Sequence, residues 1–142
     1  MAIKLDKVNL ELIESYGEGA YPHECCGFLL GKQNDAGKEV LATLPALNAR
    51  EEAASHHRFL ITPEDFLRGE KFARGQNMDM IGFYHSHPDA GAEPSVYDRE
   101  HAWPWYSYVI VAVLNEKAQD VTSWILDDDR SKFTQERILL KR

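Results

Sequence analysis

The run YSYVIVAVLN at residues 106–115 constrains the fold of this chain more than any other segment. It is rich in Val, Ile and Tyr, the β-branched and aromatic residues that favour strands. No stretch of the sequence approaches the ~18 consecutive apolar residues that a membrane-spanning helix needs. The chain is therefore predicted to fold around a β-sheet that includes residues 106–115.

Periodicity and turn residues predict the other elements. Further strands are expected at residues 25–31, 39–48, 57–62, 79–87, 121–126 and 133–140, of which the last is also compatible with a helix. Helices are expected at residues 5–16, 63–74 and 95–102. Because these elements do not alternate as regular βαβ units, we expect a mixed α/β (α+β) fold with helices flanking a central, mostly antiparallel sheet.

Two of the expected helices have recognisable ends. Thr62-Pro63-Glu64-Asp65 offers an N-cap, a proline at the first helical position and acidic residues in the first turn. The helix over residues 5–16 is expected to end at Gly17-Glu18-Gly19. Its buried face is expected to consist of Leu5, Val8, Leu12, Ile13 and Tyr16.

Length and charge exclude several classes of protein. The 142 residues show no internal repeat or linker, so a single domain over 1–142 is expected. The net charge of −7 and a pI near 5.3 argue against nucleic acid or an anionic membrane as partner. Acidic residues in the first 19 positions argue against a signal peptide. Two adjacent cysteines can neither staple distant segments nor form a zinc finger, and a reduced, cytoplasmic location is expected.

The segment His85-Ser86-His87-Pro88, followed by Ser95 and Asp98, carries the chemistry. Side chains two apart on a strand share a face, so His85 and His87 project together. Asp98, in the first turn of the next helix, supplies a third, anionic ligand, and this set leaves a position for water as in catalytic zinc sites. Each part also has a structural explanation, since Ser95-x-x-Asp98 can be a helix cap. The combination favours the metal site.

A water activated by a metal ion needs a base, and Glu24 stands directly before an apolar strand in His23-Glu24-Cys25-Cys26-Gly27. This position is also compatible with a solvated strand end. The His-Glu-x-x-His motif of other zinc proteases is excluded, because Gly27 stands where the second histidine is needed. The Pro-Cys-x-x-Cys motif of zinc deaminases is absent from the sequence.

Glu24, His85-x-His87, seven residues, Ser95, two residues and Asp98 together resemble the JAMM signature of the JAB/MPN-domain metalloproteases. The flanking segments HECCGFLLG, RFLITPEDF and IGFYHSHP resemble that family as well, and the resemblance extends over about residues 5–115. It is strongest to the small, stand-alone bacterial and archaeal branch. The implied fold is a sheet flanked by helices, similar to that of cytidine deaminases.

The resemblance implies a zinc metallopeptidase with one Zn²⁺ per chain. His85, His87 and Asp98 would be the metal ligands, Glu24 the general acid and base, and Ser95 a hydrogen-bond donor to the oxyanion. The implied substrate is the amide bond after the C-terminal Gly-Gly of a ubiquitin-like sulfur-carrier protein. Trimming of that carrier and release of cysteine from it both remain open, as does a homodimer. The alternatives are a non-catalytic MPN scaffold and a JAMM hydrolase of an unrelated peptide.

Other residues are expected to have structural roles. Cys25 and Cys26 are expected to pack in a strand, and His23, His56 and His57 to lie on the surface. His101 is expected on the surface, with a hydrogen bond near the metal as the alternative. Core or rim packing is expected for Trp103 and Trp105, with substrate contact also open. The loop 89–94 suits either a mobile lip or a plain connection, and Asp127–Asp129 suits a solvated turn.

Overall fold

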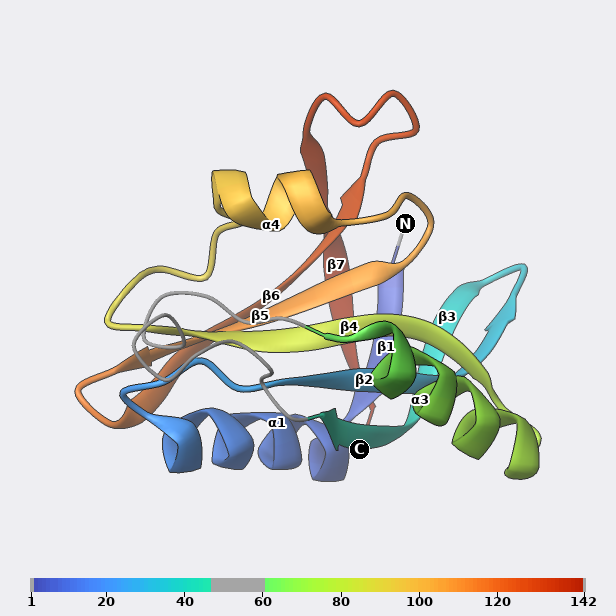
Figure 1. Cartoon of the computed structure of the whole chain (residues 1–142), viewed down its shortest axis with the longest axis horizontal. Helices are drawn as coiled ribbons and strands as arrows, with labels where there is room; N and C mark the ends of the chain where they lie inside the picture. The colour runs from blue at the N-terminus through green and yellow to red at the C-terminus, as the bar shows by residue number, and fades with distance from the viewer. Residues whose placement is uncertain (1, 47–60, 142) are drawn as a thin grey trace.

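The structure, a computed structural model, describes residues 2–46 and 61–141. Within these ranges, seven strands pair edge to edge into a closed barrel in the order β1-β3-β2-β4-β5-β6-β7 (Figure 1). The strands are β1 (Ala2–Asp6), β2 (Cys26–Asn34), β3 (Gly37–Ala46), β4 (Asp79–Pro88), β5 (Ser107–Leu114), β6 (Lys117–Leu126) and β7 (Phe133–Lys141). The helices are α1 (Lys7–Ala20), α3 (Pro63–Gly75) and α4 (Val96–His101). The expected mixed α+β fold is confirmed.

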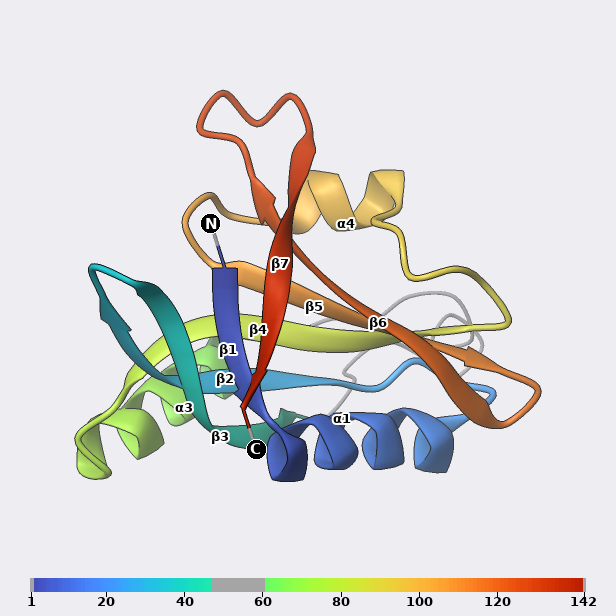
Figure 2. The same cartoon turned by 180° about the vertical axis from the view of Figure 1, so that it is seen from behind.

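The direction of strand pairing decides where the connections run. β2 pairs antiparallel with β3 and β4, and β6 pairs antiparallel with β5 and β7, so the prediction of a mostly antiparallel sheet is confirmed. β1 runs parallel to both β3 and β7 and closes the barrel between them (Figure 2). β4 and β5 are also parallel, and parallel neighbours need a crossover connection. That crossover contains α4, which is thereby brought over one side of the sheet.

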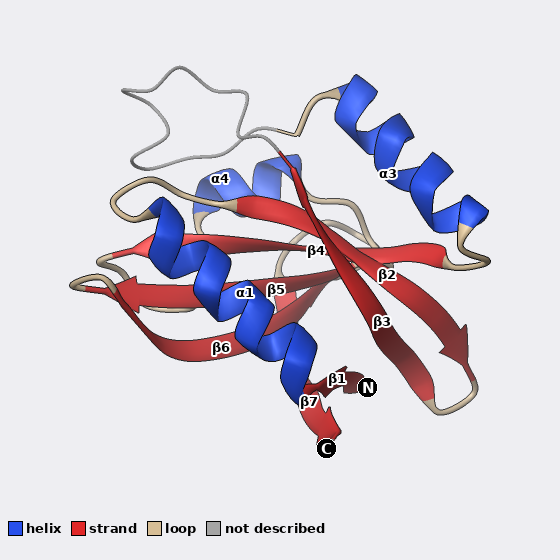
Figure 3. Ribbon diagram, turned by 90° about the horizontal axis from the view of Figure 1, so that it is seen from below, coloured by secondary structure: helices blue, strands red, loops and turns tan. Residues whose placement is uncertain are grey.

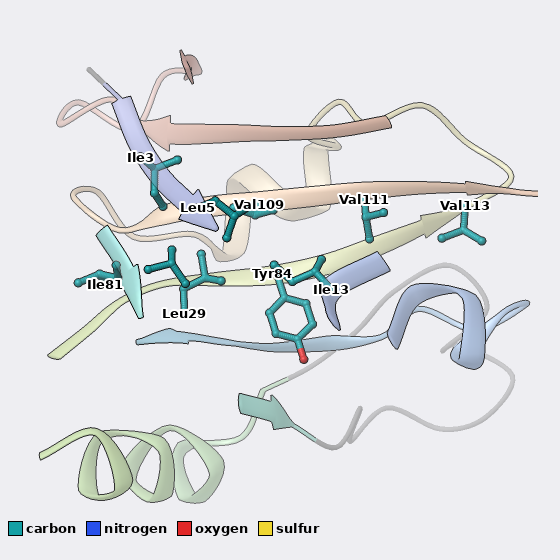
Figure 4. Close-up of a cluster of buried hydrophobic side chains, with 10 residues drawn as sticks. Ile3, Leu5, Ile13, Leu29, Ile81, Tyr84, Val109, Val111 and Val113 are labelled. Carbon is teal, nitrogen blue, oxygen red and sulfur yellow. The ribbon is translucent and has the colours of Figure 1, made fainter. Parts of the chain in front are cut away.

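Two groups of buried side chains cover the two sides of the strands. The first lies between the strands and α1, and ten buried residues form it (Figure 4): Ile3, Leu5, Ile13, Leu29, Val40, Ile81, Tyr84, Val109, Val111 and Val113. The second includes residues of α3 and the end of α4, with Phe28, Leu30, Ala73, Met80, Phe83, Ala102, Tyr108 and Leu126. α1 therefore lies across one side of these strands and α4 on the other (Figure 3).

The first helix differs from the prediction at both ends. Residues 2–6 form β1, in which Ile3 and Leu5 are fully buried, and α1 begins only at Lys7 after the N-cap Asp6. Val8 and Leu12 are exposed rather than buried. The helix continues past Gly17 to Ala20. Glycine at position 17 lets α1 approach β5 closely, since a Cβ there would lie 3.0 Å from Val113 Cγ2.

The remaining boundaries agree more closely. α3 has the predicted cap, with Thr62 Oγ1 accepting a hydrogen bond from the Asp65 amide at 3.1 Å. β6 begins at Lys117, earlier than expected, and the ambiguous C-terminal segment is the strand β7. The expected strand over 57–62 falls largely outside the described residues, and 61–62 are not in a strand. Of the helices in the described ranges, none combines the length and apolarity that crossing a membrane requires.

Candidate metal centre

The alternation of β4 directs its two histidines to the same side of the sheet. Tyr84 belongs to the buried cluster beneath α1, and Ser86 lies close to Gly17 of that helix. His85 and His87 therefore point the opposite way, toward α4, as predicted. They are only 1% and 8% exposed. Two imidazoles are thus held side by side and away from bulk water.

The start of α4 brings an aspartate to these histidines. Ser95 is the N-cap: its Oγ accepts a hydrogen bond from the Asp98 amide at 3.0 Å, and Asp98 Oδ2 accepts one from the Ser95 amide at 2.9 Å. This reciprocal capping box fixes the orientation of the Asp98 carboxylate. The helix-cap and metal-ligand interpretations of Ser95-x-x-Asp98 are therefore compatible, because the cap aims Asp98 Oδ2 at the histidines.

Three potential ligand atoms form a small triangle. His85 Nε2 lies 3.1 Å from His87 Nε2 and 3.2 Å from Asp98 Oδ2, and the distance from His87 Nε2 to Asp98 Oδ2 is 3.1 Å. Tetrahedral zinc with bonds of about 2.0–2.1 Å separates its ligand atoms by about 3.3 Å. The triangle therefore has nearly the size that a zinc ion requires, and two imidazoles with one carboxylate are donors that zinc accepts.

The tautomer of His87 supports a cation at this point. His87 Nδ1 lies 2.9 Å from the carbonyl oxygen of Gly91, so Nδ1 carries a proton and donates it. In the neutral ring, Nε2 then carries a lone pair that faces Asp98 Oδ2. The carboxylate oxygen also carries lone pairs, so both atoms are hydrogen-bond acceptors. Two acceptors at this distance need a proton or a metal ion between them. The residues present therefore fit a bound divalent metal.

Burial and the short contacts set the protonation states. Burial lowers the pKa of His85 below its usual value. Burial also acts to lower the pKa of His87, but the hydrogen bond and charge of Asp98 outweigh it and raise that pKa. Burial acts to raise the pKa of Asp98, yet the adjacent His85 and His87 hold it well below the usual range. Asp98 is thus ionised near neutral pH, as a metal ligand must be.

Glu24 lies on the same side of the sheet, beside His87. Cys26 pairs with His85 in the antiparallel β2–β4 ladder, and Ser86 N donates to Cys25 O at 3.1 Å. Continuing this register sets Glu24 opposite His87, and directly opposed residues point to the same side. Glu24 is only 6% exposed, and its charge contributes to the raised pKa of His87. The structure thus brings Glu24 to the candidate metal centre.

A cavity of about 820 Å³ adjoins the centre between α3 and α4. It reaches His85 and Asp98, and its other lining residues are Ile61, Thr62, Pro63, Phe66, Leu67, Phe83, Tyr97, His101, Trp103, Pro104, Tyr106 and Tyr108. Leu67 and Trp103 are also 64% and 63% exposed, so the cavity has an apolar rim. Sequence reasoning missed this cavity because its walls come from several separate segments. Of the two tryptophans for which substrate contact was left open, Trp103 lines the cavity.

The other histidines, cysteines and tryptophans singled out in the sequence lie outside the ligand triangle or outside the described residues. His101 is exposed, and its Nδ1 is 2.9 Å from the Tyr97 carbonyl within α4. Burial raises the pKa of the Cys25 and Cys26 thiols to about 11 and about 12, which agrees with packing rather than reactivity. Trp105 is 45% exposed. His56 and His57 lie outside the described residues.

Hydrogen bonds hold the loop 89–94 at its first residue and at Ala92. Asp89 accepts hydrogen bonds from the Tyr21 hydroxyl at 2.5 Å and from the Asn115 amide at 3.0 Å. The Ala92 carbonyl accepts one from Thr122 Oγ1 at 2.6 Å. These contacts favour a fixed connection over a mobile lip.

Comparisons with known proteins agree with this geometry. The family model of prokaryotic homologues of the JAB domain matches residues 8–127. A desampylase of Haloferax volcanii is 38% identical over 93 residues, which are 65% of this chain and 64% of that protein. A desampylase of Pyrococcus furiosus is 31% identical over 120 residues, 83% of this chain and 76% of that protein. This chain thus spans less than two thirds of the Haloferax relative.

Solved structures show the same fold. A Desulfitobacterium hafniense protein superimposes with a TM-score of 0.86 at 28% identity, over 100% of this chain and 94% of its own. A JAB1/MPN domain protein of Archaeoglobus fulgidus gives 0.57 at 17% identity, over 98% and 99%. With a family model that matches most of its length, this chain belongs to the prokaryotic JAB family.

Proposed function

We propose that this protein is a zinc metallopeptidase that hydrolyses the amide bond after the C-terminal Gly-Gly of a ubiquitin-like sulfur-carrier protein. One observation carries the proposal: ligand atoms of His85, His87 and Asp98 converge at 3.1–3.2 Å beside a buried glutamate. The two relatives that are named desampylases agree with a hydrolase of this kind. We further propose that residues 1–142 act as a single domain, in the cytoplasm.

In this proposal, His85, His87 and Asp98 hold one zinc ion. When bound, zinc supplies Lewis acidity toward water and toward the amide carbonyl. The two histidines are neutral donors and Asp98 is the anionic one, so the set neutralises only part of the charge of Zn²⁺ and preserves that acidity. The protein fixes Asp98 through the cap of α4 and His87 through Gly91 O.

Glu24 is proposed as the general base and acid. It takes a proton from the attacking water and delivers it to the amine that leaves when the C–N bond breaks. Its burial, with 6% exposure, keeps bulk water from competing for that proton. Ser95 is exposed, and because its Oγ accepts the Asp98 amide hydrogen bond, the hydroxyl still has its own proton to donate. We assign that donation to the oxyanion of the substrate.

The cavity beside the centre supports a protein substrate with an apolar surface. Its walls are largely aromatic, and its rim exposes Leu67 and Trp103. An exposed apolar patch of this kind is typical of a site for a partner protein. In this proposal, a Gly-Gly tail, which has no bulky side chains, approaches the metal through the cavity, while the body of the carrier covers the rim.

Mass spectrometry of a cleavage reaction tests the proposal. The substrate is a sulfur-carrier protein extended beyond its Gly-Gly, and a second substrate carries a single added cysteine. We expect zinc-loaded protein to cut after the second glycine, and a chelator to abolish the cut. The Glu24→Gln variant should lose at least about 100-fold in rate, because proton transfer typically contributes 10²–10⁴-fold.

Glu11→Gln is the matched control, since Glu11 is exposed on α1 and forms a surface ion pair with Lys7 at 3.9 Å. It should retain full activity. Zinc binding without cleavage of either substrate would reject the sulfur carrier as the target. Absence of zinc binding would reject the enzyme and favour a scaffold.

A further inference from the structure

The carbonyl group that orients the His87 ring belongs to an exposed glycine, Gly91. His87 Nδ1 donates to Gly91 O at 2.9 Å. Gly91 is exposed, and a Cβ added there would meet nothing within 4 Å. Among the described residues, no neighbour packs where a Gly91 side chain would stand. The contacts of adjacent residues in the connection between β4 and α4 (Figure 1) are therefore the next place to look for what holds this carbonyl.

Ala92, the next residue, is anchored to the sheet. It is 4% exposed and belongs to a small buried cluster with Ile110 and Ala112 of β5, against which Trp124 packs. Its carbonyl oxygen accepts a hydrogen bond from Thr122 Oγ1 of β6 at 2.6 Å. The connection thus folds over β5 and reaches β6.

The strand register places Thr122 on the same side of the sheet as the histidines. His85 pairs with Ile110, and Ile110 pairs with Thr122. Directly paired residues of neighbouring strands point to the same side. Thr122 therefore belongs to the same side of the sheet as the candidate metal centre, two strands away from His85.

Trp124 determines the direction of the Thr122 hydrogen bond. Its Nε1 lies 2.8 Å from Thr122 Oγ1. An indole N–H can only donate, so the threonine oxygen accepts this bond and directs its single proton elsewhere. The acceptor available to that proton is Ala92 O. The two hydrogen bonds therefore run in one direction: Trp124 donates to Thr122, and Thr122 donates to Ala92 O.

We propose that Thr122, oriented by Trp124, is a positioning residue for the metal centre. By holding Ala92 O it fixes the adjacent Gly91 carbonyl, which in turn holds the Nδ1–H tautomer of His87 and directs Nε2 toward Asp98. The inference rests on the proposed metal site. Hydrogen-bond partners of metal-bound histidines typically alter metal affinity by 10–100-fold, and here that support extends through a second strand.

Three variants test the role of the hydroxyl. Thr122→Val keeps the shape and branching of the side chain but removes the hydroxyl, whereas Thr122→Ser keeps the hydroxyl. Thr134→Val is the matched control, because Thr134, exposed at the start of β7, donates from Oγ1 to Asp127 Oδ1 at 2.7 Å, a bond that involves neither histidine. Zinc affinity is measured by competition with a chromophoric chelator. Imidazole ¹⁵N shifts report the tautomer of His87 in metal-free protein.

We expect Thr122→Val to weaken zinc binding by about 10-fold or more and to give a mixture of His87 tautomers. Thr122→Ser and Thr134→Val should keep the wild-type affinity and the Nδ1–H tautomer. Unchanged affinity and tautomer in Thr122→Val would overturn the inference, and so would an equal loss in Thr134→Val. If wild type itself bound no zinc, the proposed function would fail, and the tautomer shifts alone would decide the role of Thr122.

If Thr122→Val does not fold, a second variant, Trp124→Phe, tests the same inference. Trp124→Phe removes the indole donor and retains an aromatic ring on β6. It should shift zinc affinity and the tautomer in the same direction by a smaller amount. Wild-type values for both in a folded Trp124→Phe protein would overturn the inference.

Discussion

Three neighbouring groups determine the chemical state of His87. Its Nδ1 donates to Gly91 O, its Nε2 faces Asp98 Oδ2 at 3.1 Å, and the charge of Glu24, just before β2, raises its pKa further. The opposing effects of burial and of Asp98 leave its pKa above the ordinary 6.5. The same contacts that prepare His87 for a metal therefore also strengthen its affinity for a proton, and the two cations compete.

This competition predicts a pH dependence of zinc binding. Below the raised pKa of His87 the ring binds a proton, which must leave before zinc can bind, so affinity should fall as pH falls through that value. Because the pKa is raised, the fall should begin above pH 6.5, where a free histidine would still be mostly neutral. Calorimetry in buffers of different ionisation enthalpy counts the released protons. Affinity that stays constant from pH 7.5 to about 5.5 would contradict this assignment.

At the scale of elements, the packing of α1 on β5 depends on one glycine of the helix. Gly17 is buried, and a Cβ there would lie 3.0 Å from Val113 Cγ2 and 3.2 Å from Val111 Cγ1. Both valines are buried and have little room to move. Gly19, two residues later in the same helix, has nothing within 4 Å of the same position. The two glycines thus separate the steric effect of a methyl group from its effect on helix propensity.

We expect Gly19→Ala to raise the free energy of unfolding by about 0.5–1 kcal/mol, the usual gain from replacing glycine in a helix. Gly17→Ala should lower it by about 1–2 kcal/mol, because overpacking outweighs the same gain. Urea denaturation of both variants and wild type measures the difference. Equal stabilisation by the two substitutions would show that α1 can move away from β5 at little cost.

At the scale of the whole molecule, buried polar groups link four strands of the barrel. Lys38 of β3 is 3% exposed, and its ammonium group donates to Trp105 O and to Ser107 Oγ of β5. Glu136 of β7 accepts a hydrogen bond from Ser123 Oγ of β6 at 2.7 Å. Burial lowers the pKa of Lys38 to about 8, although the charge of Glu136 acts in the opposite direction. Lys38 thereby ties β3 to the segment that forms one wall of the cavity.

The depressed pKa predicts how Lys38 affects stability at alkaline pH. Between about pH 8 and 10.5 the lysine is neutral in the folded protein but protonated in the unfolded chain, so its contribution to stability rises with pH. Wild type should therefore gain stability relative to Lys38→Met between pH 8 and about 9.5, by about 1 kcal/mol after solvent screening. The comparison cancels the titration of cysteines and tyrosines. Guanidinium denaturation of both proteins at the two pH values measures it, and a constant difference would contradict it.

Local sequence determined much of the site. Strand alternation set His85 and His87 on one side of β4, and the Ser95 cap positioned Asp98 in the first turn of α4, because both patterns depend only on residues a few positions apart. The family signature that contains Glu24 and these residues was likewise visible in the sequence. The helix signals at Thr62 and Pro63 were correct for the same reason.

Only the tertiary structure decided the rest. The prediction missed β1 and began the first helix at residue 5, because these five residues form a strand only by pairing with β3 and β7, far away in the sequence. The parallel pairing of β4 with β5 carries α4 over the histidines, and the register of β2 brings Glu24 beside His87. The aromatic cavity, the buried Lys38 and the support of Gly91 by Thr122 combine side chains from separate strands. Such contacts form only when the barrel closes and buries its core. They join residues that are far apart in the sequence, so a pattern read over a few neighbouring residues cannot predict them.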